Sequence, residues 1–278
     1  MLVFAEFLLL GLGIGCLGAL VGAGGGFILT PLLLLLFPDR PPEIITATSL
    51  TVVALNALSA FLAYYRLGRA DMKTGFLYGL VASPWVVVGV FGTTRTARGP
   101  FDLLLGILLL GLCLSLLTSS SGEAKPTPSR GGLLALSERR IVDRAGTVFA
   151  YRFRFRLGFL TSMLIGFMAS FFGIGGGPFN VPVWIRILKM PPHIAAATAP
   201  CMLLVTTSLA VAIHSLLGNV LAMADVIVPL AVGVVGGAQA GAGLSGRLRS
   251  VTLTRILAAL LTLISIQILY KGAATLLR

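Results

Sequence analysis

The chain has 278 residues, of which 57% are hydrophobic and only 11% are charged, with a mean hydropathy of +1.01. Soluble domains contain roughly 45–50% apolar and about 25% charged residues, so this composition excludes an ordinary soluble domain and predicts an integral membrane protein. The apolar segments lack period-2 alternation, which argues against a β-barrel and favours an all-α bundle. The formal net charge of +12 falls mostly between those segments, where membrane topology places it, so nucleic acid is not expected as a partner.

The chain begins with an apolar run and a glycine motif. Leu2 to Val21 has about the 20 residues that a helix needs to cross a hydrocarbon core of about 30 Å. It has no basic residue before it and no cleavage site after it, so a retained helix is expected rather than a signal peptide. The motif Gly22-Ala-Gly-Gly-Gly-Phe27 follows. The next run, Phe27 to Phe37, is too short to cross at about 1.5 Å per residue, and the glycines before it and Pro31 within it predict a broken or re-entrant helix.

Three further crossings complete the first half, at Ile44 to Tyr65, Thr74 to Phe91 and Phe101 to Leu117. The composition then changes, because Ser119 to Arg156 holds eight Lys or Arg against three acidic residues. The positive-inside tendency places this stretch in the cytoplasm, and its alternating second part is compatible with a β-hairpin. We therefore predict a first transmembrane repeat at 1–118, a basic cytoplasmic linker at 119–156 and a second transmembrane repeat at 157–278.

The second half repeats the first. Gly173-Ile-Gly-Gly-Gly-Pro178 stands 151 positions after the first glycine motif and precedes another short apolar run. The register continues at offsets of 150 and then 154, so that Ala47-Thr48 falls on Ala197-Thr198 and Ala70-Asp71 on Ala224-Asp225. The segments predicted in this half are crossings at Leu157–Phe172, Ile194–Leu217, Val226–Leu244 and Leu253–Tyr270, and the short run at Phe179–Leu188. We infer two homologous repeats of four to five helices each, with a Gly-rich broken or re-entrant helix in each repeat.

The count of crossings leaves the topology open. Re-entrant short runs give four crossings per half and parallel repeats, whereas short runs that cross give five per half and inverted repeats. We favour inverted repeats, because they readily produce alternating access. Arg95 and Arg98 lie outside in either scheme, against the positive-inside rule.

Two broken helices, one per repeat, are typical of a transporter site near the membrane midplane. Consecutive N–H groups at the start of each half-helix suit an anion, and nearby hydroxyl and amide groups can add neutral donors. The competing interpretation is that the glycines are packing surfaces and that the hydroxyls bond to their own helices. The candidate substrate-binding residues are Gly24, Gly25, Gly26, Pro31, Thr48, Ser49, Asn56, Gly175, Gly176, Gly177, Asn180, Pro182, Thr198, Thr207 and Ser208.

The coupling ion has little support in the sequence. No Asp, Glu, Lys or Arg falls clearly in the middle of a long crossing, so no carboxylate relay is expected. His214 is the candidate for proton coupling, with a sodium ion as the alternative. The three cysteines lack CxxC spacing, so no metal site and no cofactor are predicted. HExxH, GxGD and paired carboxylates are absent, so no enzymatic activity is predicted. A homodimer is compatible with the sequence.

The paired motifs resemble those of a known family. Gly22-Ala-Gly-Gly-Gly-Phe-Ile-Leu-Thr-Pro31 and Gly173-Ile-Gly-Gly-Gly-Pro-Phe-Asn-Val-Pro182, each followed by Ala-Thr, are similar to those of the sulfite exporter TauE/SafE family, also called the 4-toluene sulfonate uptake permeases. The resemblance covers the chain except the linker. It implies a multi-pass protein of the cell inner (plasma) membrane, a secondary transporter that exports sulfite, sulfonates or other small organic anions by alternating access between the repeats.

The second copy departs from the family pattern in two places. Ala199-Pro200 stands where the first copy has Ser49, and Pro178 follows the last glycine of the second motif. A site lined by both repeats is therefore expected to be asymmetric. The alternatives to a sulfur-anion carrier are an anion channel and a carrier for a non-sulfur organic anion.

Overall fold

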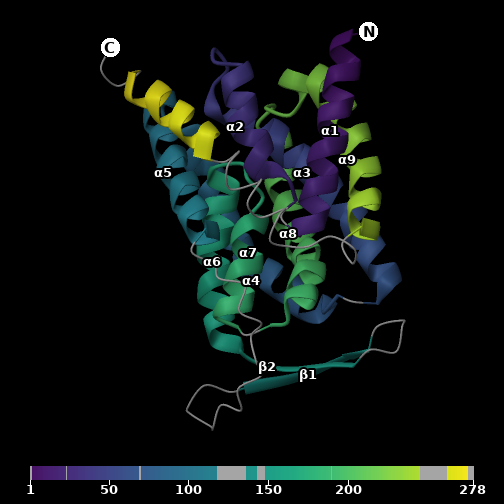
Figure 1. Cartoon of the computed structure of the whole chain (residues 1–278). Coiled ribbons are helices and arrows are strands. Elements are labelled where there is room, and N and C mark those ends of the chain that lie inside the picture. Colours follow the sequence, from purple (N-terminus) through teal and green to yellow (C-terminus); the bar gives the residue numbers. More distant parts are fainter. Residues whose placement is uncertain are drawn as a thin grey trace.

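The computed structural model describes residues 2–22, 24–68, 70–117, 136–142, 148–188, 190–244 and 262–274. The first half forms α1 (Leu2–Val21), α2 (Gly26–Leu36), α3 (Pro42–Leu67), α4 (Met72–Thr94) and α5 (Arg98–Leu117). The second half forms α6 (Phe155–Phe171), α7 (Gly177–Arg186), α8 (Pro192–Leu216), the 3₁₀ turn η1 (Leu221–Met223) and α9 (Ala224–Leu244), and residues 262–274 are helical (Figure 1). The predicted all-α membrane architecture is confirmed: among the described residues, five helical stretches are long and apolar enough to cross a bilayer.

A short antiparallel hairpin lies at one end of the bundle. Strand β1 (Leu136–Val142) pairs with β2 (Val148–Arg154), and Leu136 stands opposite Arg154. The hairpin leads directly into α6 and lies at the end of the bundle opposite the two chain termini (Figure 1). We call this end the hairpin face and the other the termini face. Residues 119–135 and 143–147 of the predicted linker lie outside the described residues, and so do residues 253–261 of the predicted crossing at 253–270.

Local chemistry explains where the long helices begin and end. Pro42 and Pro192 occupy the first helical positions of α3 and α8, where a missing N–H costs nothing. Gly68 ends α3 in the left-handed conformation, with φ of 69°, and its N–H donates to the carbonyls of the last turn. Asp71 then caps α4, because its carboxylate accepts the N–H of Thr74 at 3.1 Å.

The first two helices form a hairpin that returns to the face where it started. The rings of Phe7, early in α1, and Phe37, directly after α2, stack with centroids 6.3 Å apart, so both ends lie on the termini face. The 11 residues of α2 extend about 16 Å, roughly half the hydrocarbon thickness. The glycine hinge between the two helices therefore lies near mid-depth. Leu2 to Val21, predicted as a crossing, is among the stretches long and apolar enough to cross, and α2 folds back beside it.

Close helix pairs join the two halves. A methyl group added at Gly11 or Gly15 of α1 would lie 2.5 Å from the carbonyl oxygen of Leu230 or Val234 of α9, so the two helices run parallel with their backbones in near contact. The equivalent pair with the halves exchanged is α6 and α4, since α6 corresponds to α1 and α4 to α9. These two helices also run parallel, because Gly158 and Gly166 of α6 pack against Tyr78 and Ala82, which follow in the same order along α4.

Corresponding helices of the two halves run in opposite directions. The last helix of each half shows this directly: Gly106 of α5 packs against Leu269, whereas Cys113, further along α5, contacts Thr262, which comes earlier in its own helix. Helices α3 and α8 are opposed as well, since α8 runs parallel to α4 and α4 follows α3 after a short turn (Figure 1). Inverted repeats would produce this arrangement, and the repeat relation between the halves stays a prediction.

The apolar core lies between α2 and the surrounding helices. Eight of the 11 residues of α2 are buried, and Phe27, Leu29 and Leu33 pack in a cluster with Phe101 of α5 and Phe171 of α6. Large apolar side chains are exposed on the outer surfaces of the other helices, Leu9, Leu80 and Leu160 among them, as expected for surfaces that face lipid.

Candidate functional site

Two glycine hinges stand at the breaks between α1 and α2 and between α6 and α7. Each hinge has three glycines in the left-handed region, with φ between 71° and 80°: Gly22, Gly24 and Gly25 in the first, and Gly173, Gly175 and Gly176 in the second. A left-handed conformation costs an L-residue roughly 1–2 kcal/mol, so three in one turn require glycine. The predicted glycine breaks are therefore present in both halves with the same backbone conformation.

Each hinge leaves backbone donors without acceptors. Among the described residues, no acceptor is found for the N–H groups of Gly25, Gly26 and Phe27, nor for those of Gly176 and Gly177. Consecutive unpaired N–H groups at a helix start form an anion-binding concavity at the positive end of the helix dipole. Pro178 has no N–H, so the second hinge has no donor at the position that corresponds to Phe27.

The two hinges interlock across the halves. A methyl group added at Gly24 would lie 2.5 Å from Cδ2 of Leu203 in α8, and one added at Gly175 would lie 2.6 Å from Cγ1 of Val53 in α3. Val53 and Leu203 are corresponding residues at an offset of 150, and both stand near the middle of their helices. The hinges therefore meet at mid-depth against the centres of the long helices. The hinge of each half contacts the long helix of the other half.

The outer glycines of the hinges, Gly22 and Gly173, also contact the long helix of the opposite half. A methyl group at Gly22 would lie 2.7 Å from the carbonyl oxygen of Ala196, and one at Gly173 would lie 2.8 Å from Cα of Thr46. Thr46 and Ala196 correspond at the same offset of 150. Both outer glycines are therefore in close contact with the long helix of the opposite half.

Buried polar side chains tie the hinges together unequally. The hydroxyls of Thr30 and Ser49 both donate to the carbonyl oxygen of Gly173, at 2.7 and 2.8 Å. Asn56 donates through Nδ2 to the carbonyl oxygen of Gly24 at 2.7 Å, while its Oδ1 has no partner among the described residues. Asn180, only 1% exposed, has no partner for either side-chain atom, although a methyl group at Gly176 would lie 3.7 Å from its Nδ2.

An unpartnered buried amide needs an explanation. Burying a polar atom without a hydrogen bond costs about 1–3 kcal/mol, and native proteins rarely leave one in that state. Asn56 and Asn180, predicted as donors from sequence, flank opposite hinges with spare hydrogen-bonding capacity. They are the side chains best placed to meet a polar ligand there.

The other predicted residues are placed differently. The hydroxyls of Thr48 and Thr207 donate to carbonyls of their own helices, and Thr198 accepts the N–H of Asp71 at 3.0 Å. Ser208 is exposed, and Pro31 and Pro182 lie inside α2 and α7.

His214 lies in the last turn of α8, toward the termini face. Its side chain is buried, its Nδ1 lies 3.3 Å from Nδ2 of Asn219, and its Nε2 has no partner among the described residues. It is thus separated along α8 from the hinges, which pack near the middle of that helix.

Three buried polar residues of the two hairpins were not among the residues predicted from sequence. Thr30 was part of the quoted motif, but its long-range bond to Gly173 has no local signature. Trp184 follows Asn180 by one helical turn, and its Nε1 has no partner among the described residues. Ser162 of α6 also has an unpartnered hydroxyl. The spacing of four residues between Asn180 and Trp184 could have indicated that their polar groups lie on the same face of the helix.

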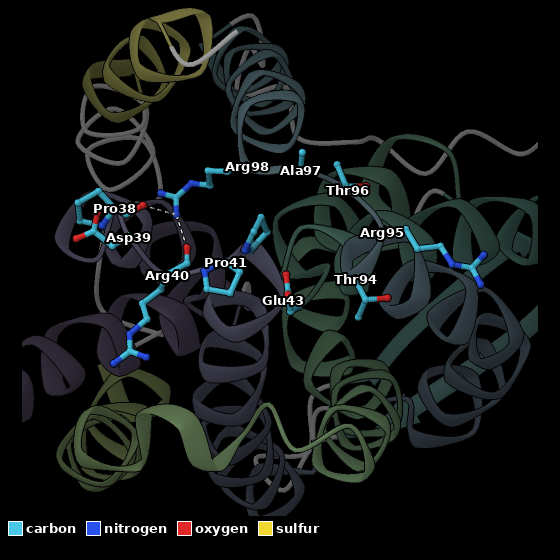
Figure 2. A pocket seen from close by; sticks show the side chains of 11 residues that line it. Pro38, Asp39, Arg40, Pro41, Glu43, Thr94, Arg95, Thr96, Ala97 and Arg98 are labelled. Carbon is cyan, nitrogen blue, oxygen red and sulfur yellow. Dashed lines mark hydrogen bonds between the residues drawn. The ribbon is translucent and has the colours of Figure 1, made fainter. Parts of the chain in front are cut away.

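A surface pocket of about 380 Å³ lies on the termini face, between residues 38–43 and 94–98 (Figure 2). Figure 2 shows the side chains of Arg40 and Arg95 pointing away from each other, not converging on a ligand. Arg98 is engaged: it donates to Asp102 at 2.8 Å and to the carbonyls of Leu34, Pro38 and Arg40. This pocket marks the junction that anchors the end of α2, and the hinges remain the candidate site. Among the described residues, no group of three His, Cys, Asp or Glu could hold a metal ion.

Comparison with known proteins gives a consistent picture. The family model described as Sulfite exporter TauE/SafE matches residues 7–268. The chain is 28% identical to the probable membrane transporter protein YunE of Bacillus subtilis, over 97% of this chain and 98% of that protein. It is 33% identical to the probable membrane transporter protein YdhB of the same species, over 64% of each chain. It is 25% identical to the probable membrane transporter protein MJ0441 of Methanocaldococcus jannaschii, over 69% of this chain and 67% of that protein. No solved structure gives a significant match.

Proposed function

The chain belongs to the sulfite exporter TauE/SafE family of membrane transporters, and from that premise we propose that it is a secondary carrier of small sulfur-containing anions such as sulfite or sulfonates. The resemblance drawn from the paired glycine motifs is thereby confirmed, and so is the multi-pass membrane location. The observation that carries the proposal is the pair of interlocked glycine hinges, whose unpaired N–H groups lie at mid-depth.

The chemistry of the hinges favours an anion held by neutral donors. None of the buried residues in the described part of the chain is Lys or Arg, so a fixed positive side chain is not available at this depth. Backbone N–H groups at a half-helix start can replace part of the hydration shell of an oxyanion without that charge. The three sulfonate oxygens, or those of sulfite, match a concavity that offers several donors at once.

The arrangement of the halves supports alternating access between inverted repeats. Two re-entrant hairpins enter from opposite faces, α1–α2 from the termini face and α6–α7 from the hairpin face, and meet against the centres of α3 and α8. In this structure the hinge glycines are buried and tightly packed, so a ligand can enter only if the hairpins and the long helices separate. Separation on one face at a time would expose the same mid-depth site alternately.

A reconstituted transport assay tests the proposal. Proteoliposomes containing the protein should take up or release labelled sulfite, sulfoacetate or another sulfonate with saturable kinetics. Gly176→Ala should abolish this transport, because the new methyl group would lie 3.0 Å from Ile165 in a left-handed backbone. Gly218→Ala is the matched control, since it also has a left-handed backbone, with φ of 78°, but no atom within 4 Å of the new methyl group.

Other outcomes separate the alternatives. Transport of carboxylates alone would replace the sulfur anions with a non-sulfur organic anion, and single-channel currents would replace the carrier with an anion channel. Failure to transport any anion in the panel would refute the proposal. A dependence of the rate on a proton or sodium gradient would identify the coupling ion, with His214→Gln as the variant that tests proton coupling.

A further inference from the structure

Three buried polar residues of the second hairpin have atoms that the fold does not use. Asn180 and Trp184 of α7 and Ser162 of α6 are each at most 1% exposed. Nδ2 and Oδ1 of Asn180, Nε1 of Trp184 and Oγ of Ser162 all lack a hydrogen-bond partner among the described residues. Such atoms are uncommon in folded proteins and concentrate where a ligand, water or ion binds.

These residues lie in one part of the hairpin. Asn180 and Trp184 are four positions apart in α7, which places them on the same helix face about one turn from each other. Gly176, one turn before Asn180, packs against Ile165 and Ala169 of α6.

Contacts among three aromatic rings show where Ser162 lies along the length of the hairpin. The ring of Tyr78 in α4 lies 5.9 Å from the rings of both Trp184 and Phe159, which places the early part of α6 beside the late part of α7. Helix α6 therefore runs antiparallel to α7, and Ser162 falls between the levels of the hinge and of Trp184. The donors form a track from the second glycine hinge toward the hairpin face.

The first hairpin has no such track. At the same offset of 151, the residues that correspond to Ser162, Asn180 and Trp184 are Gly11, Leu29 and Leu33. Leu29 and Leu33 are fully buried in the apolar core, and Gly11 is in close contact with α9. The same positions can therefore be filled with apolar residues in this fold, so packing alone does not require polar side chains in the second half.

On the premise of the proposed function, we propose that the substrate's oxyanion group is bound one-sidedly by the second hairpin, with Nδ2 of Asn180 and Nε1 of Trp184 as N–H donors and the Ser162 hydroxyl as a third donor. The ligand class is an oxyanion that accepts several hydrogen bonds, such as a sulfite or sulfonate group. The unpaired N–H groups of Gly176 and Gly177 continue the same donor set at the hinge.

Tryptophan fluorescence gives a direct test. The chain has two tryptophans, and Trp85 is 43% exposed on α4, so Trp85→Phe leaves Trp184 as the sole reporter. Titration of this variant in detergent with sulfite and with sulfoacetate should give a saturable change in Trp184 emission. Asn180→Leu in this background should weaken the apparent affinity at least about tenfold, which corresponds to about 1.4 kcal/mol. Ser215→Ala, at an exposed site of α8 where the hydroxyl donates only to the carbonyl oxygen of Val211 in its own helix, should leave the affinity unchanged.

Two further measurements distinguish binding from packing. Asn180→Leu should not lower the melting temperature of the ligand-free protein, because it removes unpartnered polar atoms, whereas loss of a structural contact would lower it. Trp184→Phe keeps an aromatic ring and removes the N–H, so it should raise the KM for transport in proteoliposomes at least severalfold. If Asn180→Leu does not fold, Trp184→Phe decides the question by the transport assay alone.

The outcomes separate the two proposals. If the wild-type protein transports a sulfur oxyanion and both variants bind and transport it like the wild type, the one-sided site is refuted while the carrier function stands. If the wild-type protein neither binds nor transports any anion tested, the carrier function itself is refuted.

Discussion

Replacement of Gly173 by alanine tests whether the hinges are held by backbone conformation and by contact between the halves. The residue has φ of 71°, which costs an alanine roughly 1–2 kcal/mol. The new methyl group would also lie 2.8 Å from Cα of Thr46 and 2.9 Å from its Cβ, in the opposite half. Overpacking of this kind costs about 1–3 kcal/mol, so we expect a total loss of about 2–5 kcal/mol.

A matched control separates the free-energy cost of the contact with Thr46 from the cost of the left-handed backbone. Gly218→Ala has the same left-handed backbone but no neighbour within 4 Å, so only the conformational cost of roughly 1–2 kcal/mol applies. Thermal unfolding in detergent can be followed with a thiol-reactive fluorophore, since Cys113 and Cys201 are buried. At about 2–4 °C per kcal/mol, Gly173→Ala should unfold at least about 2 °C below Gly218→Ala. Equal melting temperatures would refute the idea that the halves interlock at this glycine.

Three other substitutions probe the helix contacts around the hinges, each with the same unfolding measurement. Arg98→Ala should cost about 1.5–3 kcal/mol, the range for hydrogen bonds to a charged group, because it leaves Asp102, whose side chain is 6% exposed, without its partner. Adding Asp102→Ala should recover part of the loss. No loss would mean that the pair does not anchor the end of α2. Gly233→Ala should lower the free energy of unfolding, since its methyl group would lie 2.7 Å from the backbone nitrogen of Leu12. Gly236→Ala in the same helix, with no atom within 4 Å of the new methyl group, should be neutral or stabilising by about 0.5–1 kcal/mol. A Gly236→Ala variant less stable than Gly233→Ala would contradict the α1–α9 contact. Thr93→Val removes a hydroxyl that donates to the carbonyl oxygen of Phe171 at 2.6 Å, and we expect a loss of only about 0.6 kcal/mol, typical of hydrogen bonds between membrane helices; a loss several times larger would show that this bond also supports the second hinge.

The hinges could be predicted from sequence because their determinants are local. Consecutive glycines followed by a proline signal a break and a new helix start, and the predicted run Phe27 to Phe37 differs from α2 by one residue at each end. The second break was predicted for the same reason, and its three left-handed glycines match those of the first. The correspondence between the halves added weight, because a repeated local signal is much less ambiguous than a single one.

The return of α2 beside α1 could not be predicted, because it depends on a contact between residues 30 positions apart. Length and composition make Leu2 to Val21 a crossing, and only the stack of Phe7 on Phe37 shows that the two helices return to one face. Helix α1 itself is long and apolar enough to cross, as its composition predicts, and what the sequence does not reveal is that α2 folds back beside it.

The position of Arg98 on the termini face also depends on contacts that are distant in sequence. Arg98 violated the positive-inside expectation, yet its guanidinium is paired with Asp102 and donates to three backbone carbonyls at the end of α2. Its charge therefore serves a local contact, and a rule that counts free loop charges does not describe it. The Asp102 partner, four residues later in the same helix, was the signal that sequence reasoning passed over.

The two halves differ in the hydrogen-bond donors that their hairpins offer. At the start of α2 the residue after the last glycine is Phe27, for whose N–H no acceptor is found among the described residues, whereas the residue at the same place before α7 is Pro178, which has no N–H. The second hairpin instead has Asn180, Trp184 and Ser162, where the first has only apolar residues. Two equivalent hinges would offer a small anion two equivalent positions, and a ligand at mid-depth would have no preferred orientation. At the proposed site, donors concentrated in one hairpin would remove that degeneracy, so that one half would orient the substrate although both hinges have the same backbone conformation.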